Sequence, residues 1–427
     1  VKYIVDNKNG IGTILLIKDA EIQESSKFDA GTDITFNLQN HTLTTTKRII
    51  NKGKLKVING TITDLEDDVI QNENDLTVEN CTFTSHSSYT GIYVQEGVSN
   101  VTNLSVKDST INGGVYGLLA SSTENIVVEN SNISGSDVGI YLNSESSTLD
   151  FKSGTITSSN GICIRVSNSS TTQIASATIN TKTHGIYGYC QYANVTIDDA
   201  DITSTNNEAI RFDTHNTNYN TLIVKDGTYK GADYGIVAQS THLTMTGGSV
   251  ETTSTSRDRY AIYGYYYSDL DLSNVTLTAN NASGLYINTP AELNNINITA
   301  KRDNSYGIYV ADYTVNIKGN TNIKTTGANS YGIYMNNGTL TMNNGDIDSN
   351  NIGIYMNNSS KVNIYNGSIY AHEYGIYQYH ASTVLTIGKT TDELSSENPL
   401  IRGKKYGIYK ENGTSYFYNG KLGGAIY

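Results

Sequence analysis

Residues 306–310 read YGIYV, residues 331–335 read YGIYM and residues 352–356 read IGIYM. A Gly-Ile-Tyr motif of this kind recurs from residue 91 to the end of the chain. Its copies begin at Gly91, Gly117, Gly139, Gly161, Gly185, Ala209, Gly235, Ala261, Gly284, Gly307, Gly332, Gly353, Gly375, Gly407 and Ala425. The steps between copies range from 18 to 32 residues and average about 24. A short repeat with a variable step is typical of a solenoid, whose coils stack while their loops differ in length.

Alternation within the motif separates its residues into two faces. The second position is Ile or Leu, as at Ile308 and Ile333, and the fourth is mainly apolar, as at Val310 and Met335. Because side chains alternate sides along a strand, these two positions should face the core. The first, third and fifth positions are then expected to face outward.

A second pattern precedes each motif. It reads Leu-x-Val, with another apolar residue five positions after the Val, as from Val57 to Ile62. An odd spacing between two core residues requires a bend, which Gly60 marks in this copy. We therefore predict an all-β fold, a single-stranded right-handed parallel β-helix with three short strands per coil and three parallel sheets. About 18 coils of about 24 residues would form a rod of roughly 85 Å at the usual strand spacing.

The motif also divides the chain. Residues 1–50 lack it and are expected to form an N-terminal cap and entry coils, whereas residues 51–427 are expected to form the β-helix coils. The chain ends inside a motif, at Ala425-Ile426-Tyr427, so we expect the coils to continue in a longer parent protein. The longest step, from Gly375 to Gly407, contains Thr390–Pro399, which we expect to protrude as a loop.

Composition and charge disfavour several classes of function. The chain has 33 Tyr and 39 Gly but only 2 Pro and no Trp, and its net charge is −12. A negative surface is unsuited to nucleic acid, and no apolar stretch is long enough to predict direct membrane insertion. The three Cys and seven His show no disulfide or metal-binding spacing, so we expect no metal and no cofactor.

The entry region resembles a known class of proteins. Residues 36–43, FNLQNHTL, and residues 55–62, LKVINGTI, resemble the entry coils of right-handed β-helix regions in large surface proteins of Gram-positive bacteria. The Gly-Ile-Tyr coils resemble the same class, which shares the pectin-lyase-like fold. This resemblance implies an exported, cell-surface setting, but the same scaffold also carries lyases and hydrolases.

Two adjacent acidic residues, Asp67-Asp68, are similar to the paired aspartates of galacturonases. That family's Gly-His-Gly and Arg-Ile-Lys motifs are absent from this sequence. Acidic residues near a turn are usually solvated, and we expect this pair to be so. The sequence therefore assigns no catalytic residue.

One group of coils departs from the regular pattern. The residue before the motif is usually Tyr, but it is Asn160, His184 and Glu208 in three successive coils. In this register Cys163 and Arg211 replace the outward Tyr, and the fifth positions are Arg165, Tyr189 and Asp213. Stacking would bring His184 to Glu208, with both arginines nearby, forming either an ion-pair ladder or a ligand site. Glu208 and Asp213 would lie about 16 Å apart on an extended strand, too far for a two-carboxylate glycosidase.

A tyrosine occupies the third motif position in most coils. Stacking predicts an outward column that includes Tyr309, Tyr334, Tyr355 and Tyr377, with Asn336 and Asn357 in the fifth position beside it. Flat aromatic faces beside amides are suited to contact with a glycan or a peptide. Stacked aromatic rings also stabilise a sheet without any ligand, so a purely structural ladder remains an alternative.

Three functions follow from these observations. The first is an extracellular adhesive or structural stalk that presents the Tyr/Asn face to a glycan or a host or cell-surface protein, and it is the one we favour. The second is a polysaccharide lyase or glycoside hydrolase acting at His184, Glu208 and Arg211. The third is a self-assembling filament or phage-spike segment.

Overall fold

The computed structural model describes residues 2–6, 10–95, 102–122, 124–214, 217–390 and 398–426, with the backbone alone for residues 2–6 and 425–426. These residues contain 51 strands and no helix, arranged as a parallel solenoid of about 17 turns, close to the expected 18. They form two compact units, Val1–Thr205 and Asn206–Tyr427. Most of the expected Thr390–Pro399 loop lies outside the described residues.

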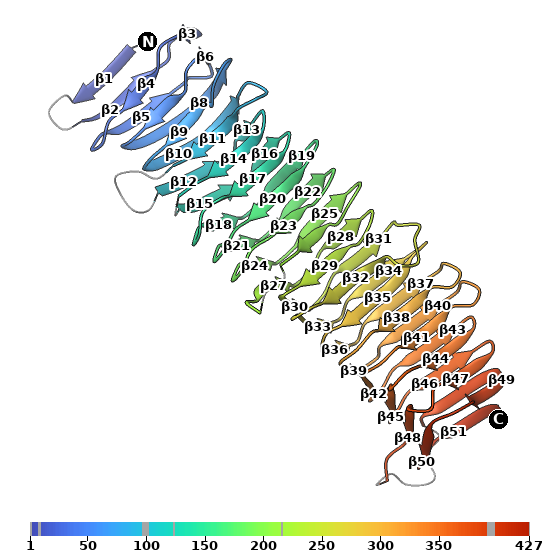
Figure 1. Cartoon of the computed structure of the whole chain (residues 1–427). Helices are drawn as coiled ribbons and strands as arrows, with labels where there is room; N and C mark the ends of the chain where they lie inside the picture. The colour runs from blue at the N-terminus through green and yellow to red at the C-terminus, as the bar shows by residue number, and fades with distance from the viewer. Residues whose placement is uncertain are drawn as a thin grey trace. The chain divides into compact units, whose positions relative to one another are not determined.

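Each coil of the first unit contributes strands to three parallel ladders, named A, B and C (Figure 1). Ladder A contains β2 (Ile11–Leu15), β5 (Asp33–Asn37), β8 (Lys54–Asp64), β10 (Asp75–Thr84), β12 (Thr102–Lys107), β15 (Glu124–Glu129), β18 (Thr148–Phe151), β21 (Thr171–Ile174) and β24 (Asn194–Ile197). Ladder B contains β3 (Ala20–Ile22), β6 (Thr42–Thr45), the second halves of β8 and β10, β13 (Thr110–Asn112), β16 (Ser131–Gly135), β19 (Gly154–Ser158), β22 (Ala177–Thr181) and β25 (Ala200–Ser204). Ladder C contains β4 (Ser26–Phe28), β7 (Ile49–Asn51), β9 (Ile70–Asn72), β11 (Thr90–Val94), β14 (Tyr116–Ala120), β17 (Val138–Leu142), β20 (Ile162–Val166) and β23 (Ile186–Gly188). β1 (Lys2–Asp6) pairs antiparallel with β2. Because β2 then pairs in parallel with β5, ladder A already begins within residues 1–50.

The second unit repeats the three ladders. Ladder A contains β27 (Asn220–Val224), β30 (Thr241–Met245), β33 (Asp269–Ser273), β36 (Ala291–Asn294), β39 (Thr314–Lys318), β42 (Thr339–Met342), β45 (Lys361–Ile364), β48 (Val384–Ile387) and β50 (Thr414–Phe417). Ladder B contains β28 (Thr228–Gly231), β31 (Ser249–Thr252), β34 (Thr276–Ala279), β37 (Asn297–Ala300), β40 (Asn322–Thr325), β43 (Asp346–Ser349), β46 (Ser368–Ala371), β49 (Leu400–Lys410) and β51 (Lys421–Ile426). Ladder C contains β26 (Ile210–Phe212), β29 (Ile236–Gln239), β32 (Tyr260–Tyr265), β35 (Ser283–Asn288), β38 (Tyr306–Val310), β41 (Tyr331–Met335), β44 (Ile352–Met356) and β47 (Tyr374–Gln378), followed by parts of β49 and β51. The long strands β8 and β10 each cross a bend and join ladders A and B in the first unit, and β49 joins ladders B and C in the second unit.

The predicted core columns are confirmed. Ile308 pairs with Ile333 in the next coil, and both are buried. Val57 and Ile62 are also fully buried on either side of the bend between ladders A and B. In the first unit this bend places an Asn in the left-handed region, with φ of 59° at Asn59 and 53° at Asn80. The Asn80 amide donates to the Asn59 side-chain oxygen at 3.0 Å, so the bends are also joined from coil to coil.

The first motif position is buried, so the prediction that it faces outward is wrong. A Cβ atom on Gly332 would lie 2.4 Å from Ile347 Cγ2 and 2.6 Å from the Gly353 carbonyl oxygen of the next coil. Gly332 and the next residue, Ile333, are both buried, so the alternation of inward and outward residues is interrupted at this position. The glycine therefore serves coil packing, rather than providing space beneath the tyrosine.

The predicted register is wrong in one coil. Ile164, not Ile162, pairs with Ile140 and Ile186, and Arg165 pairs with Tyr141 and Tyr187. Residues 161–166 read GICIRV, which contains two overlapping alternations, and the chain uses the second one. Cys163 consequently occupies the buried first position, where it is fully inaccessible. Arg165, predicted at the fifth position, occupies the outward tyrosine position.

Close packing at the first position predicts the effect of adding one methyl group. Gly332→Ala should lower the free energy of unfolding by about 1–3 kcal/mol, because Ile347 and the Gly353 backbone must both move. Denaturant unfolding followed by circular dichroism measures this change. Asn343→Ala, at an exposed position, is the matched control and should change stability by less than about 0.5 kcal/mol. Equal effects of the two substitutions would contradict the packing argument.

Candidate functional site

Seven tyrosines form an uninterrupted column on the outer side of ladder C in the second unit. Coil-to-coil pairing joins the members of this column, hereafter the tyrosine ladder, in the order Tyr263, Tyr286, Tyr309, Tyr334, Tyr355, Tyr377 and Tyr409. All seven side chains are half-buried. The structure therefore brings together the four predicted tyrosines Tyr309, Tyr334, Tyr355 and Tyr377.

Most rings of the tyrosine ladder stack face to face. The centroids of Tyr309 and Tyr334 lie 5.1 Å apart at an interplanar angle of 8°, and those of Tyr334 and Tyr355 lie 5.0 Å apart at 17°. Tyr377 is turned, at 77° to Tyr355 and 89° to Tyr409. Stacked rings cover one another's faces, so ring edges and hydroxyl groups face outward. The expectation of exposed flat faces is wrong for the stacked part of the ladder.

A second set of tyrosines packs beside the ladder. Tyr306 and Tyr331, which precede the motif glycine, stack on each other at 5.7 Å and contact Tyr334 edge-on at 5.3 and 5.4 Å. Edge-to-face and offset pairs of this kind contribute about 0.5–1.5 kcal/mol each beyond the area they bury. The tyrosine surface therefore stabilises ladder C even without a ligand.

The predicted amides lie at the edge of this surface. Asn336 and Asn357 are half-buried, and the Asn357 amide donates to Tyr334 Oη at 3.5 Å. Asn336 accepts a hydrogen bond at 3.0 Å from the Asn358 amide of the next coil. Each amide retains further donor and acceptor capacity, so the edge can still form hydrogen bonds with a partner.

Burial raises the pKa of several tyrosines in this surface. The pKa of Tyr309 rises to about 12, first because of desolvation and then because of the neighbouring phenols Tyr334 and Tyr306. The pKa values of Tyr286 and Tyr355 are raised further, with desolvation again the largest cause. These three phenols therefore stay neutral throughout the neutral range.

The carboxylates of the predicted Arg211 cluster are held by the arginine. Arg211 donates to Glu208 at 3.1 Å and to Asp213 at 2.9 and 3.1 Å. Burial opposes the charge on Arg211, but attraction to Glu208 and Asp213 outweighs it and raises the arginine pKa. The predicted 16 Å separation of the two acids is wrong, because β26 has only three residues and both acids reach one guanidinium. His184 belongs to the first unit and Glu208 to the second, so their contact stays a prediction.

Asp67 and Asp68 also pair with an arginine. Arg48 contacts Asp67 at 2.5 Å and Asp68 at 2.9 Å, and Asp68 also accepts a hydrogen bond from the Thr90 backbone N–H at 2.7 Å. Asp68 is only 7% exposed, so the expectation of a solvated pair is wrong. Arg48 lies nineteen residues before Asp67, in the preceding coil. The contact between them becomes evident only when the register of the two coils is known.

Glu124 carries a buried carboxyl group that was not expected from the sequence. Its side chain is fully inaccessible, and neither carboxylate oxygen has a hydrogen-bond partner in usual geometry among the described residues. Burial raises its pKa to about 7, although the nearby hydroxyls of Ser147 and Ser122 lower it. Period-two alternation with Ile126 and Val128 places Glu124 on the core side, so the sequence did contain a signal.

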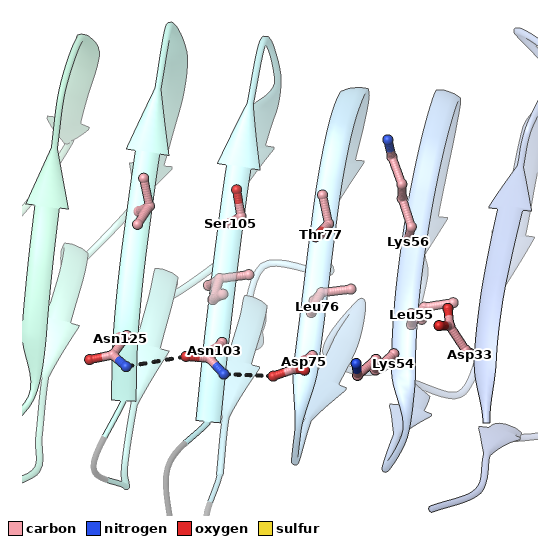
Figure 2. A pocket seen from close by; sticks show the side chains of 12 residues that line it. Asp33, Lys54, Leu55, Lys56, Asp75, Leu76, Thr77, Asn103, Ser105 and Asn125 are labelled. Carbon is pink, nitrogen blue, oxygen red and sulfur yellow. Dashed lines mark hydrogen bonds between the residues drawn. The ribbon is translucent and has the colours of Figure 1, made fainter. Parts of the chain in front are cut away.

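The outer face of ladder A in the first unit holds a shallow depression of about 410 Å³. Figure 2 shows its polar side chains in rows across successive strands, with Lys54, Asp75, Asn103 and Asn125 in one row. Asn125 donates to Asn103 at 3.2 Å, and Asn103 donates to Asp75 at 2.6 Å. These groups bond to one another from coil to coil, as expected for a structural polar ladder.

Comparisons with known proteins support the fold. Residues 48–180 match the family model described as "Right handed beta helix region". No curated protein and no solved structure matches the chain. Within the described residues, no group of His, Cys, Asp and Glu side chains could hold a metal ion, and no helix is long and apolar enough to cross a membrane. Cys81, Cys163 and Cys190 are buried free thiols.

The raised tyrosine pKa values predict two classes of phenol in alkaline titration. Tyr309 should remain neutral until about pH 12, and Tyr286 and Tyr355 should ionise at still higher pH, so these three phenols form a late class compared with a free phenol, which ionises near pH ~10. Because folding raises these pKa values, the neutral phenols contribute fully to the stability of the folded protein below pH ~10. This contribution is lost as the pH rises through the folded-state pKa values. Near-ultraviolet absorbance of phenolate measures both classes. A single transition near pH ~10 in folded protein would contradict this assignment.

Glu124 predicts a separate pH effect near neutrality. Because its folded-state pKa is raised to about 7, the wild-type protein should lose stability as the pH rises from about 4.5 through 7. Glu124→Gln removes the ionisation and should stabilise the protein at pH ~8 by on the order of 3 kcal/mol, with little change at pH ~4. Thermal unfolding across this pH range measures the difference. Glu145→Gln, at an exposed carboxylate, is the control, and equal pH profiles for both variants would argue against the assignment.

Proposed function

We propose that this β-helix is an extracellular adhesive or structural module whose tyrosine ladder contacts a glycan or a protein surface. The single observation that carries the proposal is the unbroken column from Tyr263 to Tyr409 in the second unit. The extracellular setting rests on the resemblance to surface-protein β-helices and belongs to the proposal.

The geometry of the ladder favours a long partner. Its outward groups repeat at ring spacings of 4.3–5.4 Å, close to the separation of successive strands. Hydroxyl edges and the amides of Asn336 and Asn357 offer donors and acceptors along this line. A hydroxyl-rich polymer or an extended peptide would match such a repeating row better than a compact small molecule would.

Acid–base catalysis has less support in the described residues. Glu208 and Asp213 both bind Arg211, and Asp67 and Asp68 both bind Arg48. Burial raises the pKa of Asp68, but this side chain is only 7% exposed and its carboxylate is held by Arg48 and by the Thr90 backbone N–H. It is therefore poorly placed to donate a proton to a bound substrate. A binding role therefore fits these residues better than hydrolysis does.

Substitution of three central rungs tests the contact. Replacing Tyr309, Tyr334 and Tyr355 together by Phe keeps the stacking and removes three hydroxyls. We expect binding to glycan-array or cell-surface ligands to weaken about tenfold or more, since a lost hydrogen bond to a partner costs about 0.5–1.5 kcal/mol. The triple Ala variant should weaken binding further and also lower stability.

Tyr370→Ala provides the control, because this tyrosine is 40% exposed on ladder B, away from the tyrosine ladder. It should leave ligand binding unchanged. Binding that is the same in the wild-type, triple Phe and triple Ala proteins would remove the ladder as the contact surface.

A further inference from the structure

The register of the first unit places one arginine within its own tyrosine column. Arg165 lies between Tyr141 and Tyr187, and its guanidinium carbon is 4.7 Å from the centre of the Tyr141 ring. Arginine stacked on an aromatic face loses little of its hydrogen-bonding capacity, because its N–H groups point outward in the plane. The position therefore presents a fixed cationic donor at the outer surface.

A pocket of about 280 Å³ lies in front of this arginine. Three successive coils build it: the turn after β17 contributes Asn143 and Glu145, the turn after β20 contributes Asn168, and the residue after β23 is Tyr189. The Asn168 side chain is held from both sides, since it accepts from the Gln191 backbone N–H at 2.9 Å and donates to Glu145 at 3.2 Å. The rim of the pocket is therefore fixed by side-chain contacts between coils.

Arg165 differs from the other arginines of ladder C. Arg211 contacts two carboxylates, and Arg48, which precedes β7, contacts two others. Within the part of the first unit that the structure describes, the Arg165 guanidinium has an aromatic contact but no ion pair and no hydrogen bond to protein. A half-buried guanidinium with unused donors is suited to bind an anionic group that comes from outside.

An exposed aromatic ring completes the pocket. Tyr189 is 68% exposed, the largest exposure among the large hydrophobic side chains described. It occupies the fifth position of its coil, so its ring borders the pocket two coils beyond Asn143. An aromatic ring with an uncovered face can pack against the C–H face of a sugar.

We propose that this pocket binds a sugar ring that carries one negative group, a carboxylate or a sulfate ester. Arg165 would hold the anionic group, and Tyr189 would contact the face of the ring. At the ring hydroxyls, Asn143 would accept or donate hydrogen bonds and Glu145 would accept them. The Glu145 carboxylate disfavours a multiply charged ligand such as a phosphate monoester. This site lies in the first unit and is independent of the tyrosine ladder of the second unit.

An array of carboxylated, sulfated and neutral oligosaccharides tests the proposal on the whole chain. We expect the wild-type protein to bind anionic members and to bind their neutral parents at least tenfold more weakly. Arg165→Ala should reduce anionic binding by about tenfold to a hundredfold, and Arg165→Lys should lose part of it, because lysine keeps the charge but not the planar fork. Comparison of the carboxylated and sulfated arms identifies which anion the pocket prefers.

Three controls make the result decisive. Lys182→Ala removes an equal charge from an exposed position outside the pocket and should leave binding unchanged. Tyr189→Ala changes an exposed side chain, so it should keep the fold and still weaken binding. The triple Phe variant of the tyrosine ladder should retain anionic-sugar binding, which separates this site from the proposed adhesive face. Equal binding by wild-type and Arg165→Ala proteins, or no preference for anionic sugars, would overturn the proposal.

Discussion

Hydrogen bonding between successive coils fixes which residues of the described strands lie beside one another in each unit. A strand of ladder A, B or C pairs with the strand about two dozen residues away, not with its neighbour in sequence. One residue in each coil therefore lies beside its counterpart in the next, at about the strand spacing. The Ile column at the second motif position, the buried glycines and the stacked tyrosines all follow from this single constraint. None of these columns is stable in an isolated coil, because each side chain needs the coils on both sides.

The repeat predicted the fold well because its core columns are strictly apolar. The pairing of Ile308 with Ile333 follows from the motif alone. The same reasoning failed at residues 161–166, where both Ile162 and Ile164 satisfy the alternation and no local feature selects one. It also failed at the first motif position, since strict period-two alternation allows no two successive buried residues, whereas Gly332 and Ile333 are both buried. A sequence pattern therefore predicts columns reliably where buried and outward residues alternate strictly, and poorly where this alternation is interrupted or ambiguous.

The candidate sites were predicted only in part, for a related reason. The tyrosine ladder follows from the register, so Tyr309, Tyr334 and Tyr355 could be grouped from the sequence. The orientation of their rings could not, because it depends on the second tyrosine set represented by Tyr306 and Tyr331. Contacts between charged side chains of neighbouring coils, such as that between Arg48 and Asp68, could not be predicted from the sequence either. Such contacts depend on side-chain reach across coils, and a spacing between sequence positions does not contain that information.

The orientation of the interstrand hydrogen bonds has a mechanical consequence. These bonds run along the stacking direction of each unit, so a force applied in that direction loads the end coil first and separates one coil at a time. Each separated coil would release about 24 residues, or roughly 80 Å of extended chain. A unit under tension would thus lengthen in many small, similar steps and dissipate work at each one, instead of rupturing in a single event.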